Sequence, residues 1–304
     1  DEIQVNQIKP EFLYDKLIEN NFNFFTGVPD SLLKEFCKCV DEKSRNHIIS
    51  ANEGTSIGLA SGVYLATNKY PVVYLQNSGL GNIVNPIMSL THEKVYQIPM
   101  LIIIGWRGEP GKKDEPQHKA MGEITCQMLD LMNIPYDIMP DYKEGVEECI
   151  NKSVEHFKKH STPYAFLVRK SSFEKYESIF KYPKIETVNY KFKREDLIKM
   201  IIDNIQENSA VVSTTGMCSR ELYEIREKNN EVKDFMCVGC MGHTSSIGLG
   251  VSLNTDKLTY VIDGDGSMIM HMGSMAINGQ FANKNFKHIL LNNSAHDSVG
   301  GQQT

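Results

Sequence analysis

Short apolar segments alternate with helical segments along both halves of the chain, and this alternation constrains the fold more than any other feature. Residues 99–105 are apolar on both faces, which is typical of a strand in a parallel sheet covered by helices. The rhythm predicts an α/β protein with two doubly wound parallel-sheet domains. The expected strands are 21–26, 47–51, 72–76, 99–105, 137–140 and 164–168 in the first half, and 210–213, 235–238, 258–262 and 288–291 in the second.

A charged and aromatic stretch separates the two halves. Residues 171–193 have no clean period and contain a proline, so we expect a linker between a first domain at 1–170 and a second at 194–304. The second domain offers fewer candidate strands than the first, and the sequence stops in a polar loop after the last of them. We therefore expect this domain to be incomplete at its C-terminus, with a disordered or displaced tail after about Asn293.

The richest chemical signal is VIDGDGSMIMHMG at 261–273, followed by an Asn-Asn doublet. Gly264 and Gly266 let the chain turn sharply at the end of a strand. The helix that begins near Ser267 and Met268 offers free N–H groups to phosphate oxygens. An ordinary strand-to-helix turn also explains a bare GDG, but the downstream doublet makes the pattern more specific. A dinucleotide fold is disfavoured because the third glycine of GxGxxG is missing.

Hard oxygen ligands follow two of the predicted strands. Asp265 comes after one strand and Asn293 after the next, so both side chains can reach the same edge of the sheet. A carboxylate, an amide and a backbone carbonyl just beyond, at Ala295, suit Mg²⁺. The sequence therefore predicts a magnesium site that also holds a diphosphate.

The GDG element and its doublet together resemble the signature of the thiamine-diphosphate-dependent enzymes. With TTGMCSREL, MGHTSSIGLG and NNSAHDSVGGQ, the chain is similar to the 2-oxo acid decarboxylases of that family that act on phosphonopyruvate or sulfopyruvate. The resemblance covers nearly the whole chain. It implies thiamine diphosphate and Mg²⁺ as cofactors, a pyrimidine-binding first domain and a diphosphate-binding second domain. It also implies at least a dimer, with the active site between chains.

Glu53 is the residue to which the resemblance gives the first catalytic step. In this family, a Glu that opens a helix of small residues protonates the cofactor's pyrimidine ring, and SANEG followed by IGLASGVYLAT matches that context. A Glu at a helix start also has a purely structural explanation, since it complements the helix dipole.

The resemblance assigns further cofactor contacts. Met241 would lie between the two rings of the cofactor and the Gly239 carbonyl would accept from the amino group of its pyrimidine ring. The alternative is that Met241 is only a core residue. The other assigned contacts are Gly27, Asn82, Thr215 and Gly216.

A basic segment after 99–105 suggests an anionic substrate. Arg107, Lys112, Lys113 and His118 are expected in one mobile loop, and His296 is a further candidate near the cofactor. A phosphonate beside a carboxylate needs such cationic donors. The alternative is a solvated loop balanced by its own acidic residues. Asp30, His118 or a water molecule would protonate the enamine that remains after CO₂ leaves, and this step releases the aldehyde.

Composition excludes several classes of protein. Lys and Arg number 32 against 38 Asp and Glu, which argues against nucleic-acid binding. No apolar run approaches the ~20 residues of a membrane span, and no signal peptide is visible. Seven cysteines without framework spacing indicate a reducing compartment, so we expect a cytoplasmic protein. The pairs Cys37/Cys39 and Cys237/Cys240 are too sparse for a zinc site, and buried thiols are the simpler interpretation.

The predicted activity is thiamine-diphosphate- and Mg²⁺-dependent decarboxylation of 3-phosphonopyruvate to phosphonoacetaldehyde and CO₂. Sulfopyruvate, or another 2-oxo acid, is the alternative substrate. The rival classes are a nucleotide-binding dehydrogenase and a non-catalytic regulatory homologue, and intact Glu53 and Asp265 argue against the latter.

Overall fold

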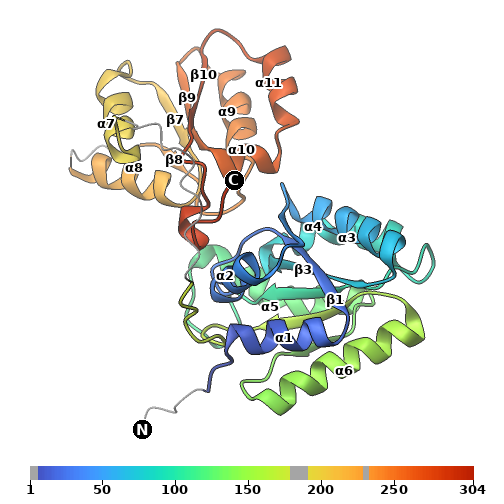
Figure 1. The fold of residues 1–304 in the computed structure, drawn as a ribbon. Coiled ribbons are helices and arrows are strands. Elements are labelled where there is room, and N and C mark those ends of the chain that lie inside the picture. The colour runs from blue at the N-terminus through green and yellow to red at the C-terminus, as the bar shows by residue number, and fades with distance from the viewer. Residues whose placement is uncertain (1–5, 179–190, 229–232) are drawn as a thin grey trace. The chain divides into compact units, whose positions relative to one another are not determined.

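A computed structural model describes residues 6–178, 191–228 and 233–304. The chain separates into two compact units, Asp1–Lys181 and Tyr182–Thr304, and Figure 1 shows the elements of each. The expected linker, 171–193, lies outside the described residues from 179 to 190.

The described part of the first unit is built on a six-stranded parallel sheet in the order β2-β1-β3-β4-β6-β5. Residues Gly27 and Ile49 pair across β1 and β2, and Gln76 and Gly105 pair across β3 and β4, so these four strands end at one edge. The strands are β1 (Phe22–Gly27), β2 (His47–Ile49), β3 (Tyr70–Gln76), β4 (Leu101–Gly105), β5 (Tyr136–Ile138) and β6 (Tyr164–Val168).

Helices cover both faces of this sheet, as the apolar strands require. Alternating strand residues point into two cores, so that Val72 packs in one core and Val73 in the other. The first core includes residues of α1 (Pro10–Glu19), α2 (Lys34–Lys43) and α6 (Lys143–His160). The second includes residues of α3 (Glu53–Thr67), α4 (Leu80–Pro86), η2 (Ile87–Thr91) and α5 (Pro116–Leu131).

The second unit has a four-stranded parallel sheet among its described residues, in the order β10-β9-β7-β8. Its core joins α7 and α8 to β7 and β9 through Ile198, Leu222, Val211 and Ile262. The strands are β7 (Ala210–Ser213), β8 (Phe235–Met236), β9 (Thr259–Gly264) and β10 (Phe286–Leu291). The helices are α7 (Arg194–Asn204), α8 (Met217–Lys228), α9 (Thr244–Ser252), α10 (Asp265–Met270) and α11 (Ser274–Phe281), with short turns η1 (Asn77–Gly79) in the first unit and η3 (Asp297–Val299) here.

These two sheets confirm the predicted α/β class with parallel-sheet domains. Among the described residues, no helix combines the length and apolar character needed to cross a membrane.

Candidate functional site

The first group of predicted site residues lies at the carboxyl edge of the six-stranded sheet. Asp30 follows β1, Glu53 follows β2 and Asn82 follows β3, while Arg107 follows β4. Ligands of open α/β sheets bind at this edge, because every strand there is succeeded by a loop that exposes its polar groups.

Glu53 is the first residue of α3 and is 5% exposed. Asn52 caps the helix by accepting from the Thr55 N–H at 3.0 Å. The Asn82 side-chain amide donates to Oε2 of Glu53 at 2.7 Å. A Cβ atom on Gly79 would stand 2.5 Å from Oε1, so only glycine at position 79 leaves room for this carboxylate. The local fold thus holds an acidic group in a buried cradle beside two residues of the 77–82 loop.

Asp30 is 1% exposed and sits in the turn after β1. Its Oδ2 accepts from the backbone N–H groups of Leu32 at 2.9 Å and Leu33 at 3.2 Å. No described residue gives its Oδ1 a hydrogen bond. Burial raises the pKa of Asp30 to about 6, although both N–H groups and the nearby Arg107 charge act in the opposite direction. Asp30 can therefore hold or release a proton close to neutral pH.

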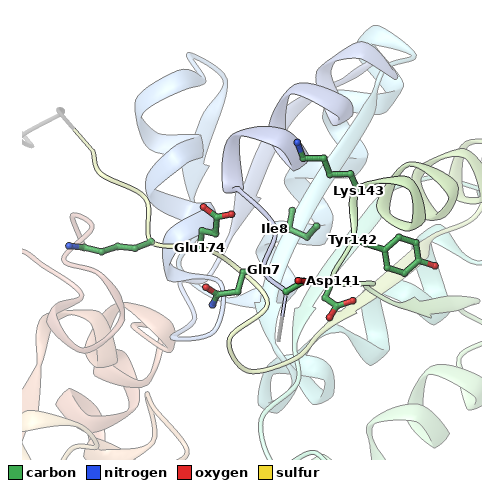
Figure 2. A pocket seen from close by; sticks show the side chains of 8 residues that line it. Gln7, Ile8, Asp141, Tyr142, Lys143 and Glu174 are labelled. Carbon is green, nitrogen blue, oxygen red and sulfur yellow. The ribbon is translucent and has the colours of Figure 1, made fainter. Parts of the chain in front are cut away.

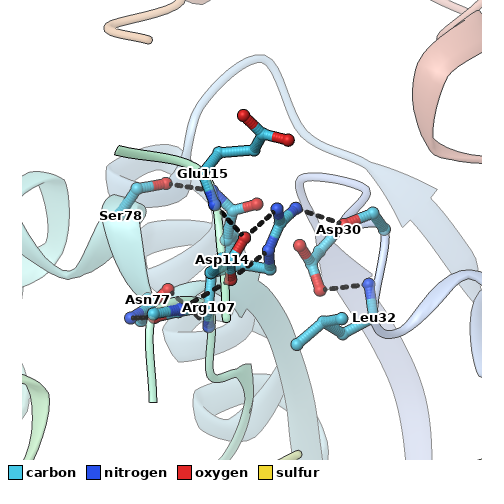
Figure 3. Close-up of polar contacts among 10 residues, drawn as sticks. Asp30, Leu32, Asn77, Ser78, Arg107, Asp114 and Glu115 are labelled. Atoms are coloured by element: carbon cyan, nitrogen blue, oxygen red, sulfur yellow. Dashed lines mark hydrogen bonds and ion pairs between the residues drawn. The ribbon is translucent and has the colours of Figure 1, made fainter. Parts of the chain in front are cut away.

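Arg107 is engaged in an internal ion pair (Figure 3). Its Nε and Nη2 donate to the two carboxylate oxygens of Asp114 at 2.8 and 2.5 Å, and Nη1 donates to Ser31 Oγ at 3.0 Å. These hydrogen bonds hold the pKa of Asp114 well below its ordinary value. The side-chain amide of buried Asn77 holds the backbone of Arg107: its Nδ2 donates to the Arg107 carbonyl at 2.7 Å, and its Oδ1 accepts from the Arg107 backbone N–H at 3.1 Å. We predicted that the Arg107 guanidinium binds substrate. In the structure it instead fixes the loop after β4 through Asp114 and Ser31.

The remaining basic candidates differ in how exposed they are and in the element on which they lie. Lys112 and Lys113 are exposed, and no described residue forms an ion pair with their ammonium groups. His118 lies in the first turn of α5, so the expectation of a loop at this position is wrong. The helix starts at Pro116, whose fixed φ favours the first helical position. Burial and the Arg107 charge lower the pKa of His118.

The second group lies at the carboxyl edge of the four-stranded sheet. Thr215 and Gly216 follow β7, and Gly216 has a φ of +87°. Gly239 and Met241 follow β8. The remaining candidates are Gly264, Asp265, Gly266, Ser267 and Met268 at the junction of β9 and α10, and Asn293, Ala295 and His296 after β10.

Asp265 and Asn293 follow two strands that are hydrogen-bonded neighbours, because Gly264 pairs with Leu291. Asp265 is 7% exposed, and its Oδ2 accepts from the Thr304 hydroxyl at 2.7 Å. The Asn293 amide is exposed; it donates to Asp297 at 2.7 Å and accepts from the Ala295 N–H at 3.1 Å. The described residues contain no group of three or more His, Cys, Asp or Glu that could hold a metal. The oxygen donors at this edge nevertheless fit the chemistry of Mg²⁺, which takes carboxylate and carbonyl oxygens and retains several waters.

The segment after β8 packs tightly on α10. The Gly242 N–H donates to Ser267 Oγ at 3.1 Å. Gly242 has a φ of +96°, and a Cβ there would stand 2.6 Å from Cδ2 of His271. The His271 ring makes an edge contact with that of His243, with centroids 4.7 Å apart. Gly239 and Met241 are therefore held next to the Asp265 loop.

The residues after Asn293 form an ordered loop, so the expectation of a disordered tail there is wrong. Residues 294–304 are described, and the His296 N–H donates to the Gln302 carbonyl at 2.7 Å. The His296 ring lies against Gly266, where a Cβ would stand 2.9 Å from Cε1, and burial lowers the pKa of His296. This loop folds back on the Asp265 turn because Thr304 supplies a hydrogen bond to the carboxylate.

An open hollow of about 660 Å³ lies elsewhere on the first unit, at the start of α6 (Figure 2). It shares no residue with the predicted site. Its lining residues are Asn6, Gln7, Ile8, Asp141, Tyr142, Lys143, Glu174 and Lys175.

The sequence did not predict the contacts of four residues that shape the first group. Asn77 and Gly79 stand in the NSGLGN loop, of which only Asn82 was singled out as a candidate. Gly105 was expected only as the end of a strand, and Asp114 only as one of the acidic residues that balance the basic loop, so the partner of neither was predicted.

Comparisons with known proteins place the chain among thiamine-dependent enzymes. Residues 10–130 match the family model "Thiamine pyrophosphate enzyme, N-terminal TPP binding domain", and residues 212–304 match "Thiamine pyrophosphate enzyme, C-terminal TPP binding domain". A phosphonopyruvate decarboxylase of Streptomyces viridochromogenes is 34% identical over 91% of this chain and 72% of its own length. A sulfopyruvate decarboxylase of Methanosarcina acetivorans is 29% identical over 83% of this chain and 67% of its own. A sulfopyruvate decarboxylase subunit beta of Methanocaldococcus jannaschii is 42% identical over 37% of this chain and 58% of its own.

Proposed function

Because the chain belongs to the thiamine pyrophosphate enzymes and is a 2-oxo acid decarboxylase of that family, we propose that it converts 3-phosphonopyruvate to phosphonoacetaldehyde and CO₂. The observation that carries this proposal is the similarity to phosphonopyruvate decarboxylases, 34% and 32% identical over 91% of the chain. In the reaction, the bond between the keto carbon and the carboxylate breaks, and a proton replaces CO₂ on that carbon.

The cationic groups of the first unit support an anionic substrate. The exposed ammonium groups of Lys112 and Lys113 are available to bind a phosphonate, which carries more charge than the single carboxylate of pyruvate. Arg107 would act mainly by holding their loop through Asp114, since its guanidinium already donates to both carboxylate oxygens. His296 would approach the substrate from the Asp265 edge of another chain.

Glu53 has the features required to activate thiamine diphosphate. The cofactor, when bound, would supply a nucleophilic carbon for the keto group and an electron sink for the electron pair that stays behind when CO₂ departs. A buried carboxylate whose Oε2 is fixed by Asn82 fits a role in sharing a proton with the pyrimidine ring. The cradle left by Gly79 suits this assignment, because it keeps the carboxylate at the sheet edge.

Asp30 is the proton donor that the geometry supports best. Its carboxyl holds a proton up to about pH 6, and its Oδ1 has no described hydrogen-bond partner. It can therefore deliver a proton to the carbon from which CO₂ leaves. His118 is the alternative donor, but burial and the Arg107 charge lower its pKa and favour the neutral ring.

Asp265, Asn293 and the Ala295 carbonyl would bind Mg²⁺ and, through it, the diphosphate. Their oxygens lie after adjacent strands, and the N-terminus of α10 beside Gly264, Gly266 and Ser267 offers N–H groups to the same anion. Thr215, Gly216, Gly239 and Met241 would complete the cofactor contacts. We further propose self-association into at least a dimer, in which the first domain of one chain faces the second domain of another.

The test is an assay of aldehyde release from phosphonopyruvate, sulfopyruvate and pyruvate, each with and without thiamine diphosphate and Mg²⁺. The proposal requires cofactor-dependent turnover with phosphonopyruvate as the best substrate. Lys112→Ala/Lys113→Ala should raise KM for phosphonopyruvate much more than for pyruvate. Lys158→Ala, an exposed lysine on α6, is the matched control.

Sulfopyruvate is the second candidate substrate, supported by the similarity to the M. acetivorans enzyme. Its sulfonate carries one negative charge where a phosphonate carries up to two. A preference for sulfopyruvate in the same assay would replace phosphonopyruvate as the proposed substrate.

A further inference from the structure

A carboxylate to which the proposed mechanism gives no role lies inside the second sheet. Asp263 stands one residue before the end of β9, which lies between β10 and β7 (Figure 1), and it is 2% exposed. Ile262 packs in the core with α8, so Val261 and Asp263 point to the opposite face of the sheet. Helix α9 covers that face, since a Cβ on Gly248 would stand 2.1 Å from Cγ2 of Val261. Asp263 is therefore a buried acid in an otherwise apolar layer.

Both oxygens of Asp263 are held by hydrogen bonds. Oδ2 is 3.1 Å from Nε2 of His288 on β10, and Oδ1 accepts from the Gly264 backbone N–H at 3.0 Å. A carboxylate can only accept, so His288 carries a proton on Nε2 and donates it. The His288 side chain is 16% exposed and lies beside the Phe286 ring. The pair is thus largely closed to water, which strengthens the interaction between its members.

The fold by itself does not explain an acid at this position. Burying a charge is costly, and a buried ion pair can often be replaced by apolar residues without loss of stability. Val261 and Phe286, which lie on the same face of the sheet, are apolar. Asp263 and His288 therefore call for a functional explanation, and the proposed metal ligand Asp265 follows two residues later.

We propose that Asp263 and His288 are positioning residues for the metal loop, and that together they raise the affinity of Asp265 for a divalent cation such as Mg²⁺. This inference rests on the proposed function, because it takes Asp265 as the metal ligand. Neither residue needs to touch the cation, since both act through the backbone at Gly264 and through charge.

The first effect is on the geometry of the loop. The Asp263 carboxylate holds the Gly264 N–H, and this peptide opens the turn from β9 into α10, whose first residue is Asp265. His288 fixes the other oxygen from the neighbouring strand and so prevents the carboxylate from rotating. The direction in which Asp265 leaves the sheet is therefore set before a cation binds, and less conformational freedom is lost on binding.

The second effect is electrostatic. Asp263 places a second buried carboxylate within two residues of Asp265, which is itself 7% exposed. Two negative charges attract a divalent cation more strongly than one, and burial limits the screening by water and salt. A neutral imidazole at His288 donates to the carboxylate without cancelling its negative charge.

The experiment measures cation binding rather than turnover. The full chain is titrated with Mn²⁺, a spectroscopic substitute for Mg²⁺, in the presence of thiamine diphosphate, and free Mn²⁺ is followed by electron paramagnetic resonance. Asp263→Asn should bind Mn²⁺ roughly 10–100-fold more weakly than the wild type, the scale of losses around a metal site. Lys287→Ala, an exposed change on the same strand as His288, should bind like the wild type.

Two substitutions of His288 separate hydrogen bonding from packing. His288→Gln can still donate from an amide close to the position of Nε2, so it should keep most of the affinity for Mn²⁺. His288→Leu fills a similar space without a donor and should lose at least roughly tenfold. The opposite order would mean that the ring only packs, and it would overturn the inference.

An apolar pair tests whether the fold needs these residues. Asp263→Val/His288→Leu leaves no buried charge without a partner, so its Tm without ligands should equal or exceed that of the wild type. Its affinity for Mn²⁺ should be as weak as that of Asp263→Asn. Wild-type affinity in this variant would overturn the inference, and loss of folding would assign the pair a structural role instead.

The wild type separates a failure of the inference from a failure of the proposed function. If it binds thiamine diphosphate and Mn²⁺, and the folded variants bind both equally well, only the inference is overturned. A wild type that binds neither contradicts the proposed function, and the inference fails with it because Asp265 then holds no cation.

Discussion

A Cβ atom on Gly105 would overlap Oδ2 of Asp30, so the buried carboxyl after β1 occupies the space that a side chain at the end of β4 would need. The two residues lie far apart in the sequence and meet because β3 holds both strands in register. A residue with no functional group of its own thereby determines where a candidate proton donor lies.

Gly105→Ala should displace Asp30 and lower turnover. Forcing a methyl group into a packed interior commonly costs about 1–3 kcal/mol. We expect a lower Tm and at least a roughly tenfold loss of turnover, because a small misplacement of a reacting group is costly. Thermal unfolding and the aldehyde assay measure the two effects.

Gly62→Ala is the control for this substitution, since a Cβ at that position meets nothing within 4 Å. It should leave turnover unchanged. Equal Tm and turnover in Gly105→Ala and wild type would show that Asp30 can shift without consequence.

Glu53→Gln should lower turnover by roughly 10²–10⁴-fold, the usual contribution of a positioned proton-transfer group. Glutamine has the same shape and can still accept from Asn82, so thiamine diphosphate binding should survive. Single-turnover kinetics measures the rate of decarboxylation, and calorimetry measures the affinity for thiamine diphosphate.

Glu123→Gln, an exposed change on α5, provides the matched control for Glu53→Gln. Near wild-type decarboxylation by Glu53→Gln would remove Glu53 from the mechanism.

Asp265→Asn should weaken cofactor binding in the presence of Mg²⁺ by roughly 10–100-fold, the scale typical of losses around a metal site. The amide keeps an acceptor for the Thr304 hydroxyl but lacks the negative charge that attracts the metal. Cofactor titrations at several Mg²⁺ concentrations measure this effect.

Asp256→Asn, on the exposed loop before β9, should leave the Mg²⁺ dependence unchanged. If Asp265→Asn behaved in the same way, the metal would have to bind elsewhere in the protein.

The sequence predicted those parts of the fold that depend on local patterns. The strands after which Glu53 and Asp265 stand are short apolar runs ended by turn residues, and the glycine-rich turns gave the motifs. Helix α5 was not predicted, because its first turn lies in a segment dense in charge, glycine and proline. Its boundary depends on Pro116, together with packing of Leu129 in the second core.

Contacts between distant residues could not be predicted in the same way. The pairing of Arg107 with Asp114 depends on a loop conformation that Asn77 fixes from another strand. Likewise, the space that Gly79 leaves for Glu53 follows from the sheet order, which one sequence does not specify. The sequence could therefore name candidate chemical groups, whereas their partners required the three-dimensional structure.

Asp30 should make the stability of the protein depend on pH in a definite direction. Its ordinary pKa of 3.8 is raised to about 6 in the folded protein, so between these values the folded state binds more protons than the unfolded state. Its contribution to stability is complete below about pH 4 and is lost as the pH rises through 6. A tenfold difference in proton affinity between the folded and unfolded states corresponds to about 1.4 kcal/mol. Asp30→Asn, which can still accept from Leu32 and Leu33, removes this dependence.

The variant should therefore gain stability relative to the wild type as the pH rises from 4 to 7, and the difference should level off above that. Urea unfolding at several pH values measures it, with exposed Asp130→Asn as the control that follows the wild type. Parallel stability curves for Asp30→Asn and wild type would mean that folding does not raise the pKa of Asp30, so that its carboxyl is ionised near neutral pH. It could then carry no proton to the product, and His118 or a water molecule would have to take that role.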